Sequence, residues 1–190
     1  KFLQNSGALT LGALAFSDGI HSLQSSGMIL KALEYIKAID GTIIQLPDDK
    51  NIAPHGLMTE GIISITSGVP GGPAIAEEIL IARDIELLKY TNSKIHFTGI
   101  STKKSVEMIA KAKSDGLKVS CSVTPYQLFF TDEDLKNYDT NLKVNHPLRT
   151  KEDMLALREG IKNGVIDFIA SHQQPQHWDD KTCEFEYAKP

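Results

Sequence analysis

The sequence predicts an α/β protein built on a parallel sheet. Short β-rich runs alternate along the chain with longer helical patterns, which is the order that crossover connections between parallel strands produce. No internal repeat, low-complexity tract or linker divides the chain, so a single domain is expected over residues 1–190. Such a sheet is either doubly wound or closed into a barrel, and periodicity alone does not distinguish the two.

The first part of the chain predicts strand, helix, strand. Residues 9–17 (LTLGALAFS) are typical of a strand, and residues 42–46 (TIIQL) indicate a buried strand that Pro47 ends. Residues 26–39 are expected to form a helix because their apolar residues recur at helical spacing. That stripe consists of Met28, Ile29, Ala32, Leu33 and Ile36.

A second helix and a third strand follow a glycine- and proline-rich loop at residues 68–73 (GVPGGP). Residues 74–90 predict a long helix, because Glu77 and Glu78 fall in a first turn, where the helix dipole favours acids. Residues 94–100 (KIHFTGI) predict the next strand.

A further helix is expected to be capped by Ser101 and to end near Gly116. Residues 118–123 predict a strand followed by a turn at Thr124-Pro125. Residues 131–138 begin with Thr-Asp-Glu-Asp, an N-cap followed by acids, and predict a short helix.

The last elements repeat the alternation. Residues 141–145 and 166–170 predict strands, and Thr150-Lys151-Glu152-Asp153 opens a helix that runs to Ile161 and ends at Asn163-Gly164. The sequence therefore contains about six strands, fewer than the eight of a complete (β/α)8 barrel.

Composition excludes two classes of function. The net charge of −4 and the pI near 5.9 argue against a nucleic-acid partner, which requires a clustered basic surface. No apolar run approaches the ~18 residues of a membrane-spanning helix, so a cytoplasmic protein without a membrane partner is expected. Cys121 and Cys183 lack CxxC spacing and are expected to be reduced thiols. No signal peptide is visible, and Lys1 in place of an initiator Met fits a fragment or a processed product.

Six blocks of sequence, in order and at compatible spacing, match the motifs of one enzyme family. They are Phe16-Ser17-Asp18-Gly19; Gly68-Val69-Pro70 with Pro73, Glu77 and Ala82-Arg83-Asp84-Ile85; Ile100-Ser101-Thr102 with Ala110, Ala112 and Gly116; Val123-Thr124-Pro125-Tyr126-Gln127-Leu128; Lys143, Asn145 and Pro147-Leu148-Arg149; and residues 166–190, with Pro175, Lys181, Phe185, Ala188 and Lys189-Pro190. Through these blocks the chain resembles the dihydroorotases, the amidohydrolases that open and close the ring of dihydroorotate.

The resemblance implies a fold and an incomplete domain. The family's fold is a (β/α)8 TIM barrel with its active site at the carboxyl ends of the strands. This chain would then be a partial barrel that lacks the first strands, with their His-x-His and substrate-binding Arg, and the C-terminal segment. Two strand edges would be left unpaired, so a homo-oligomer or a larger assembly is expected. By resemblance, that assembly could contain aspartate transcarbamoylase.

The family's chemistry requires groups that this sequence replaces. The dihydroorotases activate water with one or two Zn²⁺ ions held by His and carboxylate ligands, and an Asp after the last strand transfers the proton. One zinc-binding His falls at Leu46 and another at Gly99, and neither residue can bind a metal through its side chain. The proton-transferring Asp falls at His172, so no catalytic residue can be assigned.

Three positions remain candidates for a site. Asp18 matches a carboxylate that some family members use as a metal ligand, although a loop or capping carboxylate is an alternative interpretation. Asn145 matches a substrate-contacting Asn, and a side chain that holds a turn explains it equally well. Gln173 stands where the family has a substrate-facing His.

A new zinc site is a further alternative. His146 and His172 follow predicted strands and His177 lies on the last loop, so the three could meet at the barrel mouth, although no anionic third ligand stands at a recognisable spacing. Structural histidines are the preferred interpretation, and His96 is expected to be a hydrogen-bonded core residue. His21 and His55 lie in predicted loops, and Trp178 is expected to pack the terminal loop or to stack on a ligand.

Two functions remain open from the sequence. In the first, the protein is a dihydroorotase homologue that has lost zinc and catalysis and acts as a structural or regulatory subunit in pyrimidine biosynthesis; no cofactor is then expected. In the second, it is an active dihydroorotase, or a related zinc-dependent hydrolase of cyclic amides. The replaced ligands at Leu46 and Gly99 favour the first hypothesis.

Overall fold

A single parallel sheet organises the structure. The computed structural model describes residues 15–19, 21–52 and 54–190. The strands lie in the order of the sequence, and the register aligns Ile43 with Ile95 and Ile95 with Val119. They are β1 (Ala15–Ser17), β2 (Thr42–Gln45), β5 (Ile95–Phe97), β6 (Val119–Val123) and β7 (Phe168–Ile169).

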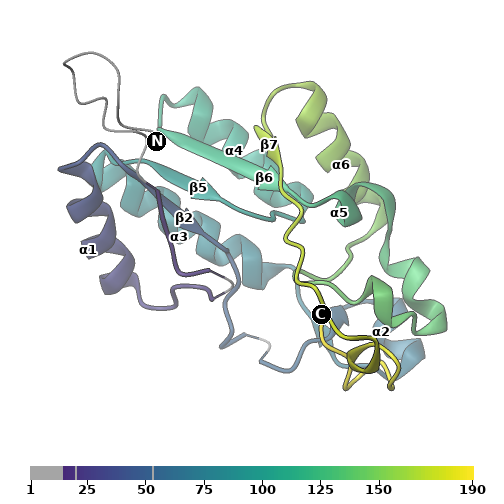
Figure 1. The fold of residues 1–190 in the computed structure, drawn as a ribbon. Helices are drawn as coiled ribbons and strands as arrows, with labels where there is room; N and C mark the ends of the chain where they lie inside the picture. Colours follow the sequence, from purple (N-terminus) through teal and green to yellow (C-terminus); the bar gives the residue numbers. More distant parts are fainter. Residues whose placement is uncertain (1–14, 20, 53) are drawn as a thin grey trace, which may run out of the picture.

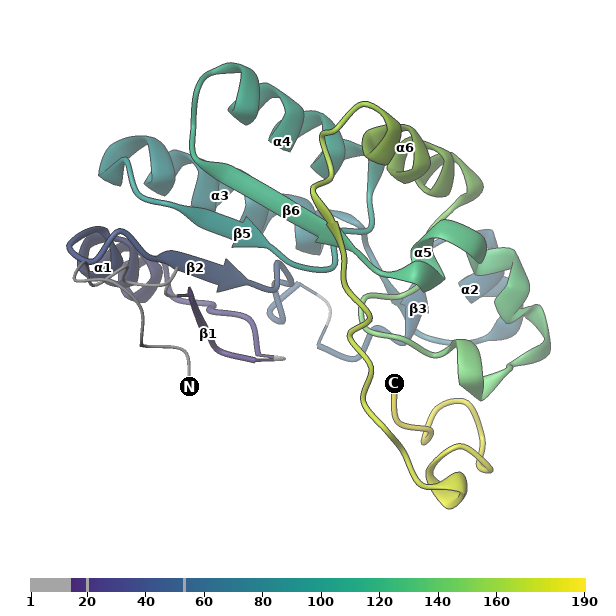
Figure 2. The same cartoon turned by 45° about the horizontal axis from the view of Figure 1, so that its top comes forward.

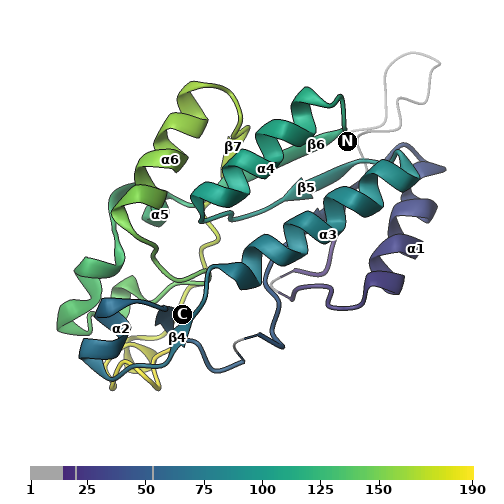
Figure 3. The ribbon, with the colours of Figure 1, turned by 180° about the vertical axis from the view of Figure 1, so that it is seen from behind.

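Four long helices lie side by side on one face of this sheet (Figures 1 and 3). They are α1 (Ser26–Lys37), α3 (Ile75–Thr91), α4 (Lys103–Ser114) and α6 (Lys151–Lys162). A doubly wound sheet reverses its strand order and carries helices on both faces, whereas a barrel keeps sequential order and has helices outside only. The predicted partial (β/α)8 barrel is therefore confirmed.

The main hydrophobic core fills the space between the sheet and these helices. Alternate strand residues point into it, so that Ile95 and Phe97 on β5 are buried against the helices. Cys121 on β6 belongs to the same core, and burial raises the pKa of its thiol to about 12. This cysteine is a free, buried thiol, as the sequence predicts.

A second, smaller cluster lies beyond the carboxyl ends of the strands. Its buried members are Met58, Leu135, Leu148 and Phe185. The elements around it are β3 (Met58–Thr59), α2 (Ile62–Ser67), β4 (Gly71–Gly72), α5 (Pro125–Phe129) and the 3-10 helices η1 (Asp132–Asn137), η2 (Thr140–Leu142) and η3 (Trp178–Asp180). Figure 2 shows the segment after β7 running from the sheet to this region, where Phe185 packs.

All four long helices lie where they were predicted, and the N-terminal caps of α1 and α6 are encoded locally. Ser25 accepts a hydrogen bond from the Met28 N–H at the start of α1. Thr150 and Asp153 form a reciprocal capping box at the start of α6. The first strand agrees with its prediction over Ala15–Ser17, and residues 9–14 lie outside the described residues.

Two predictions are wrong and one region was missed. Residues 141–145 form no strand, because the Asp139 side chain accepts the Asn141 N–H and closes the 3-10 turn η2. The cap of α4 is Thr102, since the Glu77 carboxylate binds Ser101 instead. The two-residue strands β3 and β4 gave no sequence signal, and β4 lies within the loop predicted at 68–73.

No helix among the described residues has the length and apolar character needed to cross a membrane.

The fully buried Asp84 on α3 connects this helix to the segment after β1. Its Oδ1 accepts a hydrogen bond of 2.7 Å from Arg83 Nε, and Arg83 also donates to the carbonyls of Leu23 and Gln24. Among the described residues, Asp84 Oδ2 has no hydrogen-bond partner. Burial raises the pKa of Asp84 to about 6, although Arg83 opposes the shift.

This raised pKa predicts that acid stabilises the fold. Between the ordinary pKa of 3.8 and about 6, the folded protein binds a proton that the unfolded chain releases, so the free energy of unfolding falls as pH rises through this window. The loss is at most about 3 kcal/mol. Urea titrations at several pH values should show that Asp84→Asn removes this component, whereas Asp115→Asn at an exposed position retains it. Parallel pH profiles for wild type and Asp84→Asn would contradict the prediction.

Candidate functional site

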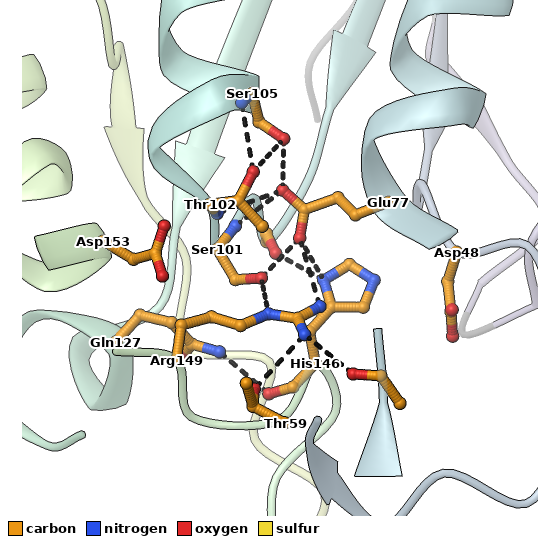
Figure 4. Close-up of polar contacts among 12 residues, drawn as sticks. Asp48, Thr59, Glu77, Ser101, Thr102, Ser105, Gln127, His146, Arg149 and Asp153 are labelled. Atoms are coloured by element: carbon orange, nitrogen blue, oxygen red, sulfur yellow. Dashed lines mark hydrogen bonds and ion pairs between the residues drawn. The ribbon is translucent and has the colours of Figure 1, made fainter. Parts of the chain in front are cut away.

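The carboxylate of Glu77 is the centre of a buried polar network at the carboxyl end of β5 (Figure 4). It accepts hydrogen bonds from the Ser101 N–H at 2.9 Å, the Thr102 N–H at 3.3 Å and the Ser105 hydroxyl at 2.6 Å. The Ser101 hydroxyl also donates to it. Glu77 belongs to the first turn of α3, and the serines and Thr102 open α4, so the network joins two neighbouring helices.

Arg149 supplies the opposite charge. Its Nη2 lies 3.9 Å from Glu77 Oε2, and its Nε donates to the Ser101 hydroxyl at 2.9 Å. Its Nη1 donates to Thr59 Oγ1 at 3.2 Å and to the Gly72 carbonyl at 3.3 Å. The buried guanidinium therefore ties β3 and β4 to the start of α4. The two buried charges compensate each other, and their contacts hold β3, β4 and the start of α4 in place around the mouth of the barrel.

His146 lies behind the mouth, within the same network. Its Nδ1 is 2.7 Å from the Gly99 carbonyl, which can only accept, so Nδ1 carries a proton. The ring is buried, and Nε2 has no hydrogen-bond partner among the described residues. The Gln127 side chain donates to the His146 carbonyl at 2.8 Å and fixes the backbone there.

A pocket of about 550 Å³ opens at the carboxyl ends of β2, β5, β6 and β7, where the barrel fold places its active sites. Most of the lining residues have polar side chains, and none of them is an acid or a cysteine. They are Gly19, Leu46, Thr98, Thr124, Pro125, Tyr126, Asn141, Lys143, Val144, Asn145, Ser171, His172, Gln173, Gln174, Lys181 and Pro190.

The imidazole of His172 occupies the space next to Gly99. A Cβ atom added to Gly99 would lie 2.5 Å from His172 Cε1 and 3.0 Å from Nδ1, closer than side chains approach. Gly99 also has a φ of +70°, which favours glycine. His172 Nε2 is 2.6 Å from Thr98 Oγ1, and burial, followed by the charge of His146, lowers the pKa of the His172 ring. Position 99 therefore has no room for a side chain while His172 keeps this position.

Polar side chains continue from His172 along the sheet face opposite the helices. Thr98 Oγ1 lies 3.1 Å from Ser122 Oγ, and His96 bridges Ser122 and Ser120 at 3.1 and 2.8 Å. His96 is hydrogen-bonded, as predicted, but it is only half-buried and does not belong to the hydrophobic core, so the prediction of a core position is wrong. Burial lowers the pKa of the His96 ring, so it is neutral at pH 7.

The other candidates divide between the pocket and the surface. Asn145 and Gln173 both line the pocket, and their contact with a substrate stays a prediction. Asp18 is exposed and is not a lining residue, although its neighbour Gly19 is. His177 is exposed and pairs with Asp179 at 3.3 Å, away from His146 and His172 in the network and the pocket.

Three further residues named in the sequence analysis lie at the surface, and four residues of the network and the pocket were not predicted. His21 and His55 are exposed, and the side chain of Trp178 is 76% exposed and is not a lining residue of the pocket, so it packs little against the terminal loop. Glu77, Arg149, Thr98 and Lys181 were not predicted as site residues. All except Thr98 lie in blocks that carry the family resemblance, which was their available signal.

These residues do not fit a zinc ion on their own. No three His, Cys, Asp or Glu side chains gather in metal-binding geometry within residues 15–19, 21–52 and 54–190. Leu46 presents a buried hydrocarbon to the pocket, and Gly99 is covered by the His172 ring. A zinc site needs three or four such ligands, so any complete site would need groups from outside these residues.

The architecture defines the class of the protein. The structure is similar to L-hydantoinase from Arthrobacter aurescens, with a TM-score of 0.71 and 24% identity over 89% of this chain and 38% of that one. It is also similar to D-hydantoinase from a Bacillus sp. AR9, with a TM-score of 0.73 and 16% identity over 93% and 42% of the two chains. The fold is therefore the TIM-barrel fold that these hydantoinases share.

Sequence comparison identifies the family within this class. The chain is 44% identical to a dihydroorotase of Acetivibrio thermocellus and 41% identical to one of Syntrophus aciditrophicus, each over 93% of its length. It belongs to the dihydroorotase family, as the motif blocks indicated. The chain spans 42% of the length of these relatives. No family model matches it.

The contact between Gly99 and His172 can be tested with a matched pair of glycines. Gly116 also has a positive φ but has open space around it, so Gly116→Ala should cost about 1–2 kcal/mol of unfolding free energy from the backbone alone. Gly99→Ala should cost about 1–3 kcal/mol more, because the new methyl group meets the His172 ring. Chemical denaturation measures both values.

In a His172→Ala background, the cost of Gly99→Ala should fall to that of Gly116→Ala, because the ring is gone. An unchanged cost of Gly99→Ala in that background would show that His172 does not occupy this space.

Proposed function

We propose that this chain is part of a dihydroorotase homologue of pyrimidine biosynthesis that binds a ligand at the barrel mouth but does not catalyse zinc-dependent ring hydrolysis. The observation that carries this proposal is the position of the His172 ring, which fills the space beside Gly99 where the family resemblance expects a zinc-binding His. Homology to dihydroorotases over 93% of the chain supports the pathway.

The chemistry of the pocket supports the same conclusion. Hydrolysis of a cyclic amide requires a water molecule activated at neutral pH and a group that moves its proton. The described lining contains no carboxylate for either task. His172 is the titratable imidazole of this wall, and its Nε2 is already engaged by the Thr98 hydroxyl. The described lining of the cavity therefore lacks the groups that would turn a bound ligand over.

A structural or regulatory role in an assembly fits the open sheet. β1 and β7 are its edge strands, and large apolar residues on both are exposed: Phe16 is 53% and Phe168 is 62% accessible. Unpaired strand edges of this kind are normally covered by further chain or by another subunit. We propose a cytoplasmic homo-oligomer or a larger complex, for which aspartate transcarbamoylase is the partner implied by the family resemblance.

A second candidate is an active dihydroorotase or a related cyclic amidohydrolase. The sequence identity of 44% to an enzyme named dihydroorotase favours it, and so does the length of the relatives, of which this chain spans 42%. Ligands contributed by residues outside the chain could complete a zinc site with His172. In that case zinc would activate water, and His172 would have to leave Thr98 to bind it.

Zinc content and turnover distinguish the two candidates. The full-length protein, purified without added metal, is analysed for zinc and assayed for dihydroorotate hydrolysis and for the reverse ring closure. The proposal predicts substoichiometric zinc and no turnover above the buffer, because no complete ligand set forms. His172→Gln serves as the control, since it should change neither result. One or two zinc ions per chain, with turnover that a chelator or His172→Gln abolishes, would establish the second candidate.

A further inference from the structure

Two lysines of the mouth pocket carry charges that the described residues do not neutralise. Lys143 and Lys181 both line the pocket, and Lys143 is 7% exposed. Within the described part of the chain, neither ammonium group lies within ion-pair distance of a carboxylate, and the lining contains no acid. Buried charges are normally paired, because burial removes the water that would solvate them.

The hydrogen bonds of these lysines leave one donor on each. Lys143 Nζ donates to the carbonyls of Phe185 at 2.7 Å and Glu186 at 2.9 Å. Lys181 Nζ donates to the carbonyls of Thr140 at 3.1 Å and Lys189 at 2.7 Å. An ammonium group has three N–H donors, so one N–H of each lysine has no hydrogen-bond acceptor among the described residues, although Lys143 Nζ also lies 5.3 Å from the centroid of the Phe185 ring.

The two ammonium groups also repel each other. Burial lowers the pKa of Lys143, and the charge of Lys181 lowers it further, while Glu186 opposes the shift only weakly. Burial likewise lowers the pKa of Lys181, against a smaller effect of Asp139. An anion between or beside the lysines would relieve this repulsion and would accept both free N–H groups.

We propose that the mouth pocket contains an oxyanion subsite, in which Lys143 and Lys181 bind a carboxylate or phosphate group of the ligand. Asn145 lines the same wall and adds an amide donor within the pocket. The subsite deepens the proposed function, because it specifies an anionic ligand for the retained cavity. It uses no metal, so it is independent of the zinc question.

The test measures how anions stabilise the full-length protein. Melting temperatures are recorded against increasing inorganic phosphate and against succinate, with sodium chloride at equal ionic strength as the screening control. A ligand that binds the folded state raises the melting temperature in a saturable way, which gives a dissociation constant. Stabilisation mainly by phosphate would indicate a phosphorylated ligand, and stabilisation mainly by succinate a carboxylate ligand; either result supports the subsite.

Variants assign the effect to the lysines. Lys181→Gln should weaken anion binding by about tenfold to a hundredfold, since it removes a charge-assisted hydrogen bond. Lys181→Arg should largely restore it, and Lys162→Gln on the exposed face of α6 should leave it unchanged. If Lys181→Gln does not fold, Asn145→Asp replaces it in the test. This variant places a negative charge in the pocket at constant size and should also weaken anion binding.

The subsite would be refuted if phosphate and succinate stabilised the protein no more than chloride. It would also be refuted if a folded Lys181→Gln variant bound the anions as tightly as wild type, which is the result expected of a lysine that only anchors the terminal segment. Zinc-dependent turnover together with lysine-dependent anion binding would overturn the proposed function and leave the subsite standing.

Discussion

The buried carboxylate of Glu77 is the constraint on which the mouth of this barrel depends. It receives hydrogen bonds from the start of α4 and the charge of Arg149, which in turn holds β3 and β4. Removing one partner of such a pair leaves an uncompensated buried charge and typically costs about 3–5 kcal/mol. The network therefore acts as a single unit that holds the segments after the strands in their positions at the barrel mouth.

The residues at the family's motif positions fall into two groups, one in the buried network and one at the pocket. Glu77, Ser101 and Arg149 build the network behind the mouth, and they agree with the family's motifs. Leu46 and His172 line the pocket and Gly99 lies against the His172 ring, and these are the positions at which the sequence departs from those motifs. The buried network behind the mouth thus agrees with the family's motifs, whereas the residues at positions 46, 99 and 172 differ from them.

The departures at Gly99 and His172 are physically coupled. A side chain at position 99 would need the space that the His172 ring fills, and the ring is held there by Thr98. Restoring a metal ligand at position 99 alone would therefore create a clash. The pocket carries two lysines and no acid among its described lining residues, and this composition suits an anionic ligand better than a metal.

Local signals in the sequence predicted the helices but not the details of the site. The apolar stripe of residues 26–39 predicted α1 and the capping sequence at Thr150 predicted α6, whereas strands of two residues such as β3 are too short for any periodic signal. The strand predicted at 141–145 is absent because the Asp139 side chain accepts the Asn141 N–H and closes a 3-10 turn, and the Lys143 side chain that follows donates to the carbonyl of Phe185, 42 residues later.

The choice between barrel and doubly wound sheet came from the family resemblance, because both architectures share the same alternation of strands and helices. The contact between Gly99 and His172 joins residues from different strand ends, and no local pattern encodes it. The same holds for the pairing of Glu77 with Arg149, which depends on how separate loops meet in the folded chain.

The most direct test of this account is a crystal structure of the full-length protein soaked in zinc, with anomalous diffraction measured at the zinc absorption edge. The account predicts that the His172 ring lies over Gly99 and contacts Thr98, with no anomalous peak at the barrel mouth. An anomalous peak within bonding distance of His172, with its ring turned away from Gly99, would contradict it.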